Sequence, residues 1–309
     1  MKNVILQGDA LTKLKELPEK SINMCMTSPP YWALRDYGVE GQLGLEPTFD
    51  EYINNLCDIF DEVKRVLRDD GTCWVNIGDT YYGGGHNRGN KKTISKKQAS
   101  NKGAIGQVQQ DWSKMDYKSK SLVMIPFRFA IEMVNRGWIL RNTIIWHKES
   151  CMPSSVKDRF TVDFEYVFFF SKSKKYYFET QREPHKNSSI ERTKHPWDGH
   201  REPMSAYVGM DISKMCHPDG RNKRCVWTIN PKPFKESHFA VYPEELCETP
   251  IKAGCIKNGI VLDPFFGAGT TGLVALKQNK KFIGIELNKE YIKIAEARIK
   301  PFLEQNKLK

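Results

Sequence analysis

Short apolar runs alternate with segments of helical periodicity over the first 80 residues. The apolar runs predict strands over residues 4–6, 22–26 and 72–77. Leucines at helical spacing predict a short helix near 11–17, and a longer apolar stripe predicts a helix over 49–67 that Asp69-Asp70-Gly71 ends. This order is typical of an α/β domain.

The pattern disappears between residues 83 and 120, where three successive glycines and several lysine pairs predict a flexible basic loop. Order returns with a helix over 122–135 that Gly137 ends, followed by strands over 138–146 and 164–170. Weak periodicity from 180 to 234 predicts a small insertion. The last quarter predicts a βαβα unit with short connections, formed by residues 260–262, 271–278, 282–285 and 291–303.

The composition predicts a soluble globular protein located in the cytoplasm. With 309 residues and 39% hydrophobic content, the chain can bury one large core, or a core that carries a smaller insertion. Neither a signal peptide nor a membrane-spanning run is expected. The eight cysteines form no CxxC pair, so we expect reduced thiols. No metal site is expected either, because the spacing of Cys216, His217 and Cys225, with His195 or His200, matches no zinc motif.

The net charge of +11 is concentrated in two stretches. Residues 81–120 hold nine Lys/Arg against two Asp/Glu, and residues 171–235 hold fourteen against seven. Together these stretches carry +14, so the other residues carry −3. Basic additions to a nearly neutral core suit a polyanionic partner, because Lys and Arg bind phosphates through counterion release. The alternative is a pair of solvated basic loops without a partner.

A strand-to-helix turn near the C-terminus has glycines at the spacing of nucleotide-binding loops. Gly267, Gly269 and Gly272 follow the 260–262 strand in a GxGxxG pattern. Glu286, at the end of the next strand, is placed to accept hydrogen bonds from two ribose hydroxyls. The turn predicts a nucleotide-type cofactor, with NAD and S-adenosylmethionine both open at this point. The alternative is a turn that serves only strand-to-helix packing.

A second motif, Thr27-Ser28-Pro29-Pro30-Tyr31-Trp32, follows the predicted 22–26 strand, where open α/β sheets place ligands. Pro30 restricts Pro29, so the Pro29 carbonyl is a rigid acceptor, and the Ser28 hydroxyl is a second one. Two acceptors beside the Tyr31 ring suit an aromatic amine whose freed lone pair attacks a methyl sulfonium directly. The alternative is a Pro-Pro turn with Tyr31 and Trp32 in the core.

Together, the two motifs resemble those of the amino-methylating DNA methyltransferases of the β group, in which the catalytic motif precedes the cofactor motif. The resemblance runs over most of the chain. Residues 27–32 resemble the catalytic motif, 263–272 the methionine-pocket loop, and Glu286 the ribose-binding acid. Gly8-Asp9 resembles the segment that contacts the cofactor adenine. Further similar segments are 238–243, before the glycine loop, and 138–148 and 164–175, around the target-base pocket.

The resemblance implies a Rossmann-like methyltransferase fold with S-adenosylmethionine as cofactor. It implies a mixed sheet of seven strands flanked by helices, permuted so that a catalytic half (1–180) precedes a cofactor half (234–309). A target recognition region is expected between them, at 181–233. The implied catalytic residues are Ser28, Pro29, Pro30 and Tyr31, and the implied cofactor-binding residues are Asp9, Asp263, Phe265, Gly267, Gly269, Thr270, Thr271 and Glu286.

The residue before Pro-Pro bears on the target base. In the family that the chain resembles, Asp or Asn there usually accompanies adenine N6 methylation and Ser cytosine N4 methylation. Ser28 therefore favours cytosine N4, with adenine N6 as the alternative. The expected substrate is a base flipped out of double-stranded DNA. A cognate restriction endonuclease is a candidate partner, and the oligomeric state is open.

Three other functions compete with this interpretation. A protein-glutamine methyltransferase uses a related Pro-Pro-Tyr turn, but there Asn precedes Pro-Pro and the cofactor half comes first. A nicotinamide-dependent oxidoreductase explains the glycine turn but not the Ser28–Tyr31 turn or the basic insertions. A non-catalytic DNA-binding module is compatible with the charge alone.

Overall fold

The computed structural model describes residues 3–83, 115–194, 216–232 and 241–307. It contains two compact units, one formed by Met1–Phe178 with Cys225–Lys309 and the other by Glu179–Arg224. Most of the basic loop predicted over 83–120 lies outside the described residues, as do residues 195–215 of the predicted insertion. No helix in the described ranges is long and apolar enough to cross a membrane.

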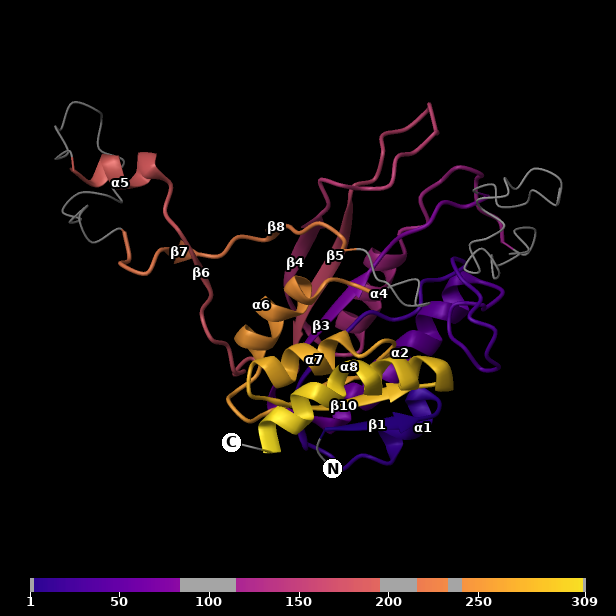
Figure 1. Ribbon diagram of the computed structural model, residues 1–309. Coiled ribbons are helices and arrows are strands. Elements are labelled where there is room, and N and C mark those ends of the chain that lie inside the picture. The colour runs from indigo at the N-terminus through magenta and orange to yellow at the C-terminus, as the bar shows by residue number, and fades with distance from the viewer. Residues whose placement is uncertain (1–2, 84–114, 195–215, 233–240, 308–309) are drawn as a thin grey trace. The chain divides into compact units, whose positions relative to one another are not determined.

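The larger unit is built on one central mixed sheet (Figure 1). In it the described residues form eight strands in the order β1-β10-β9-β2-β3-β5-β4-β8. Every neighbouring pair is parallel except those of β5, which runs antiparallel to both β3 and β4. The strands are β1 Val4–Gln7, β2 Ile22–Thr27, β3 Leu67–Ile77, β4 Ile139–His147, β5 Phe164–Ser171, β8 Val226–Thr228, β9 Ile260–Asp263 and β10 Lys281–Glu286.

The α/β class and the mixed sheet are confirmed, but the expected number of seven strands is wrong by one. The additional strand, β8, pairs in parallel with β4 and places Trp227 opposite Trp146. The Trp227 side chain is buried in the apolar core, which anchors the strand. Three residues are too few to show an alternating pattern, so we expected residues 226–228 to belong to the insertion predicted over 181–233.

Helices cover both faces of the sheet and bury two separate apolar cores. On one face lie α1, α2 and α4, and on the other α6, α7 and α8. The longest helix of the first face, α2, begins where the Thr48 hydroxyl accepts the Glu51 N–H at 3.2 Å. The helices are α1 Ala10–Lys15, α2 Phe49–Val66, α4 Ile125–Asn135, α6 Glu244–Gly254, α7 Thr270–Lys277 and α8 Lys289–Lys307.

Two parts of this arrangement differ from the sequence prediction. α2 ends at Val66 and β3 begins at Leu67, so Asp69-Asp70-Gly71 lie within a strand instead of ending a helix. Leu67 is fully buried and pairs with Ile22, which draws the start of the strand back toward the helix. α6 was not predicted because Pro250 lies inside it, and proline is unfavourable in a helix interior.

The smaller unit, Glu179–Arg224, contains a two-stranded antiparallel sheet and one helix among its described residues. Its strands are β6 Arg182–Glu183 and β7 Arg221–Asn222, and its helix is α5 Asn187–Lys194. The Glu183 carboxylate pairs with Arg221 at 2.9 Å and with Arg224 at 2.8 Å. These ion pairs connect the two ends of the unit.

The ring of Phe266 lies in a slot between α7 and β10, in the middle of the predicted cofactor loop. It stacks on Phe282 with ring centroids 5.4 Å apart. A Cβ added at Gly272 would lie 2.6 Å from Phe266 Cζ, and one added at Gly284 would overlap the ring. The third glycine of the GxGxxG pattern therefore serves helix-to-strand packing around this ring.

We predict that Gly284→Ala destabilises the protein by about 1–3 kcal/mol, because the added methyl group overpacks this slot. Urea unfolding should show a lower midpoint at an unchanged slope. Combining it with Phe266→Leu, which removes the ring, should cost about 0.5–3 kcal/mol less than the sum of the single losses. If the stability losses of the two single variants simply add, the methyl group at position 284 does not clash with the Phe266 ring, and the packing argument is wrong.

Candidate active site

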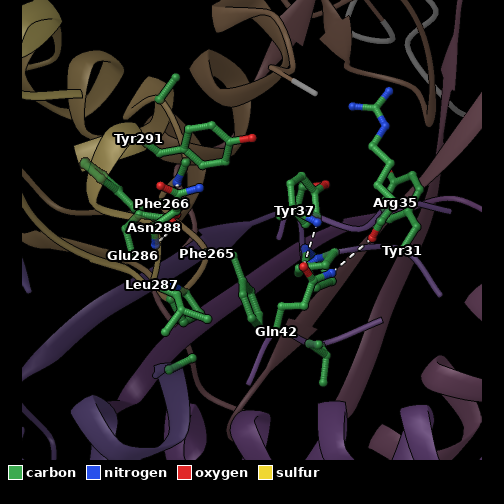
Figure 2. Close-up of a pocket in the computed structure, with 18 of the residues that line it drawn as sticks. Tyr31, Arg35, Tyr37, Gln42, Phe265, Phe266, Glu286, Leu287, Asn288 and Tyr291 are labelled. Atoms are coloured by element: carbon green, nitrogen blue, oxygen red, sulfur yellow. Dashed lines mark hydrogen bonds between the residues drawn. The ribbon is translucent and has the colours of Figure 1, made fainter. Parts of the chain in front are cut away.

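The predicted catalytic and cofactor segments meet in one pocket of about 390 Å³ at the carboxyl edge of the parallel strands. Figure 2 shows Tyr31 on one side of the opening and Glu286 on the other. Nine of the predicted site residues line it: Asp9, Ser28, Pro29, Pro30, Tyr31, Phe265, Gly267, Thr270 and Glu286. The other three, Asp263, Gly269 and Thr271, lie behind the pocket wall.

Glu286 is held at the end of β10 by backbone amides from two segments. Its Oε2 accepts the Gly267 N–H at 2.7 Å and its Oε1 accepts the Asn288 N–H at 2.8 Å. Burial raises the pKa of this carboxyl, while the amides at Asn288 and Gly267 lower it. The glycine loop thus fixes the orientation of an acid that faces the pocket.

Two tyrosines from distant segments meet on the Glu286 side of the pocket. Tyr37, after the catalytic turn, and Tyr291, on α8, pack edge to face with centroids 6.2 Å apart. Both line the pocket, together with Asn288 (Figure 2). Asp9, also in the wall, caps α1 by accepting the Thr12 N–H at 2.8 Å. The sequence prediction missed both tyrosines, because residues outside a motif give no sign of meeting in space.

Asp263 joins the two halves of the site from beneath. Its Oδ1 accepts the Thr27 hydroxyl at 2.5 Å and the Phe265 N–H at 3.0 Å. Its Oδ2 accepts the Thr271 hydroxyl at 2.7 Å, and the Tyr242 hydroxyl oxygen lies 3.2 Å from it. Burial raises the pKa of Asp263, and these hydrogen bonds lower it. Asp263 and Thr271 therefore support the pocket wall, whereas the sequence suggested direct cofactor contacts.

Tyr242 belongs to the segment 238–243, whose sequence resembles the motif before the glycine loop. Residues 238–240 lie outside the described residues, whereas Val241 and Tyr242 line the pocket. The Tyr242 hydroxyl also shares a hydrogen bond with the Thr271 hydroxyl. The segment is thereby tied to the start of α7.

The backbone carbonyls of the Pro-Pro turn differ in their partners. The Pro30 carbonyl accepts the hydroxyl of Tyr52, a buried residue of α2, at 2.8 Å. Among the described residues, no donor reaches the Pro29 carbonyl. Pro29 therefore keeps a rigid acceptor available at the pocket, while Pro30 anchors the turn to the core. Trp32 is buried, as the packing alternative for this turn expected, whereas Tyr31 lines the pocket.

Ser28 and Tyr31 join a partly buried polar cluster with Asn76 at the end of β3 and Glu165 at the start of β5. The Ser28 hydroxyl lies 3.2 Å from Asn76 Oδ1. The Tyr31 hydroxyl donates to Glu165 Oε2 at 2.6 Å. Burial and the Glu165 carboxylate both raise the pKa of the Tyr31 phenol, which keeps it protonated. Lys148, after β4, pairs with the other Glu165 oxygen.

Within this cluster, the sequence motifs singled out only residues of the Ser28–Tyr31 turn. Lys148 and Glu165 fall in segments that resemble the target-base pocket, but neither residue was predicted individually. One signal was present. Asn76 and Glu165 are polar residues within strongly apolar strands, 72–77 and 164–170. A polar group in a buried strand requires hydrogen-bond partners, and at the end of a strand these often belong to a site.

No group of three or more metal-ligating side chains occurs within the described ranges. His195 and His200, either of which would complete a zinc site with Cys216, His217 and Cys225, lie outside those ranges. The pocket offers fixed hydrogen-bond acceptors, aromatic faces, and the half-buried Glu286 carboxylate, which faces the glycine loop.

Comparison with known proteins agrees with this geometry. Residues 22–297 match the profile of the N6/N4 DNA methylase family. The type II methyltransferase M.XycI of Xanthomonas campestris pv. cyanopsidis is 42% identical over 297 residues, covering 96% of this chain and 87% of its own. M.SmaI of Serratia marcescens, also a type II methyltransferase, is 41% identical over 295 residues, covering 96% and 90%.

Solved structures of other methylases share the fold. The PvuII cytosine-N4-specific DNA methyltransferase superposes with a TM-score of 0.63 at 20% identity, covering 96% of this chain and 86% of its own. TTHA0409 of Thermus thermophilus, in complex with S-adenosyl-L-methionine, superposes with a TM-score of 0.59 at 22% identity, covering 96% and 93%.

The order of motifs, the shared pocket and the extent of the sequence match lead to one assignment. The chain belongs to the N6/N4 DNA methylase family.

Proposed function

We propose that this protein transfers a methyl group from S-adenosylmethionine to N4 of a cytosine flipped out of double-stranded DNA. The observation that carries the proposal is that Ser28-Pro29-Pro30-Tyr31 and the Glu286–Gly267 pair line one pocket. One side offers acceptors for an amine, and the other offers a carboxylate and a glycine loop for a nucleoside.

The cofactor side fits the adenosyl group. Glu286 is the acid for the ribose hydroxyls, with its position fixed by the Gly267 and Asn288 amides. Asp9, Phe265 and Thr270 contribute to the same wall, and the aromatic pair of Tyr37 and Tyr291 provides faces for a purine. When bound, S-adenosylmethionine supplies an electrophilic methyl group on a sulfonium.

The catalytic side orients the amine. The Pro29 carbonyl and the Ser28 hydroxyl accept its two hydrogens, and the Tyr31 ring stacks on the base. These contacts favour a nitrogen whose lone pair is directed at the methyl group, so positioning and local dipoles lower the barrier. The reaction needs no nucleophilic residue.

Cytosine N4 is favoured over adenine N6 by Ser28, the residue before Pro-Pro. The PvuII enzyme, whose fold this chain shares, is named as cytosine-N4-specific, which is consistent with this choice. Adenine N6 methylation is the second candidate, because both amines have the same geometry at nitrogen. Membership of the DNA methylase family argues against the oxidoreductase and the protein-glutamine methyltransferase.

The partners follow from the same reasoning. The relatives from Xanthomonas and Serratia are named type II methyltransferases, which supports a role in a restriction-modification system with a cognate endonuclease. We assign DNA target recognition to the region 181–233, whose basic residues suit phosphate contacts.

Expression in a host without DNA methylation tests the reaction directly. We expect N4-methylcytosine in the host DNA, in one short sequence context, found by nucleoside mass spectrometry and by modification-sensitive sequencing. N6-methyladenine in its place would overturn the choice of base. Unmodified DNA from a folded, expressed protein would overturn the activity itself.

Ser28→Ala should reduce kcat by about 10²-fold, the usual cost of removing one fixed polar contact to a reacting group. The dissociation constant for S-adenosylmethionine should stay within about twofold of wild type, since Ser28 lies on the amine side. Ser21→Ala is the matched control, because the Ser21 hydroxyl donates to the Pro18 carbonyl outside the pocket wall. Methylation by Ser28→Ala at the normal rate would contradict the assigned role.

Glu286→Ala should weaken cofactor binding by about 10–100-fold, because a hydrogen bond to a charged group contributes about 1.5–3 kcal/mol. Isothermal titration calorimetry with S-adenosylmethionine measures this loss. Glu290→Ala removes an exposed carboxylate close by in the chain and should leave the affinity unchanged. Equal affinities for Glu286→Ala and wild type would show that Glu286 does not bind the ribose.

A further inference from the structure

Asn76 is a buried polar residue that the proposed chemistry does not yet use. It lies near the end of β3, and only 1% of its surface is exposed. It contacts the catalytic turn on one side and β5 on the other. A buried polar side chain at this place either holds β3 and β5 together or orients the Ser28 hydroxyl that it contacts.

The orientation of the Asn76 amide is fixed by its partners on β5. Its Nδ2 lies 3.1 Å from Glu165 Oε2 and 3.1 Å from the Tyr166 carbonyl oxygen. A carboxylate and a carbonyl only accept hydrogen bonds, so the amide nitrogen must face both of them. The amide oxygen, Oδ1, must therefore face Ser28.

This orientation determines the direction of the Ser28 hydroxyl hydrogen. Asn76 Oδ1 only accepts, so at 3.2 Å the hydroxyl of Ser28 donates its single hydrogen to it. The Tyr31 hydroxyl also lies 3.2 Å from Oδ1, but its own hydrogen goes to Glu165 at the shorter distance of 2.6 Å. Both lone pairs of the serine oxygen are then left for other donors. A free hydroxyl would instead rotate, and in part of its orientations would present a hydrogen to the incoming amine.

Glu165 is fixed in turn by two further donors. The Tyr31 hydroxyl donates to its Oε2, and the Lys148 ammonium pairs with its Oε1. Lys148 is largely buried and also lies over the Trp146 ring, 4.1 Å from the centroid. The hydrogen bonds thus run from the Ser28 hydroxyl to Asn76 and from Asn76 to Glu165, whose carboxylate is held by the ion pair with Lys148.

We propose that Asn76 is a positioning residue that makes Ser28 an obligate hydrogen-bond acceptor toward the target amine. Glu165 and Lys148 keep the amide in the required orientation. This inference rests on the proposed function, but it holds for either target base, because cytosine and adenine present the same amino group. An amide is not a base, so the proton released by the methylated amine passes to water.

Asn76→Asp tests the proposal because it changes a donor into an ionisable group beside Glu165. The charged and titratable groups around position 76 are Glu165 on β5, Lys148 after β4 and Tyr31 after β2, while Asp79 further along the chain is held by the Ile125 N–H at 3.0 Å. Two carboxyl groups this close compete for one proton, so the variant should have one carboxyl with a raised pKa. The protonated pair keeps a donor between positions 76 and 165 and an acceptor for Ser28. The doubly ionised pair loses that donor, and repulsion between the two carboxylates moves the acceptor away from Ser28.

We expect kcat of Asn76→Asp to lie within about tenfold of wild type at low pH and to fall about 10²-fold as the shared proton is lost. Activity is thus present below the raised pKa of the pair and is lost above it. Wild type should show no such step. Asn142→Asp, the same change at an exposed position of β4, is the matched control and should follow wild type.

The double variant Asn76→Asp/Glu165→Gln restores a donor and an acceptor in contact, with the carboxylate now at position 76 and the amide at position 165. The glutamine amide can donate to the introduced carboxylate, which still accepts the Ser28 hydrogen. We expect the pH step to vanish and kcat at high pH to recover by at least about tenfold over Asn76→Asp. If Asn76 only ties β3 to β5, the double variant will be no faster than the single one, and the proposal fails.

The outcomes separate this inference from the proposed function. A wild-type enzyme that transfers no methyl group to DNA overturns the function. A wild-type enzyme that methylates DNA, together with an Asn76→Asp variant that follows the wild-type pH profile, overturns only the role of Asn76. Should Asn76→Asp fail to fold, judged by its unfolding midpoint, a double variant that folds but methylates as slowly as Ser28→Ala also overturns it.

Discussion

The site depends on the buried hydrogen bonds of Asp263. The carboxylate lies at the end of β9 and binds Thr27, the last residue of β2, so it joins the first residues of the cofactor loop to the residue before Ser28. The pairing between these strands is short, with Met24 opposite Val261 and Cys25 opposite Leu262. Asp263 extends the connection beyond the last strand pair and links the proposed catalytic and cofactor sides beneath the pocket. Burying a carboxylate is costly unless it is satisfied, and here the Thr27 and Thr271 hydroxyls and the Phe265 N–H satisfy it.

Much of the fold could be predicted because its elements carry strong local patterns. The apolar stripe of α2 and the runs of β2, β5 and β10 indicated their type directly. β8 could not be found in this way, because it is a strand only through its pairing with β4. α6 was not predicted because Pro250 disfavours a helix locally. Burial of the apolar face of α6 outweighs that preference.

The site was predictable where motifs follow strand ends. Ser28, Tyr31 and Glu286 lie in the pocket wall because parallel strands end at one edge of the sheet. The sequence did not show which motif residues line the pocket and which support its wall. Asp263 lies beneath the wall, and Asn76 comes from a strand that carries no motif. Their roles arise from contacts between residues far apart in the chain, which spacing alone does not show.

The pairing of β1 with β10 has a consequence for the synthesis of the protein. These strands come from opposite ends of the chain, yet Val4 lies opposite Ile283 and Gln7 opposite Glu286. The ribosome adds about 5–20 residues per second, so β1 waits for tens of seconds, while the intervening residues are made, before its neighbour exists. The Gly8 N–H, which binds the Glu286 carbonyl, is set in place in the same late event. The pocket is therefore among the last parts of the molecule to form, and a nascent chain has no complete pocket until β10 has been made.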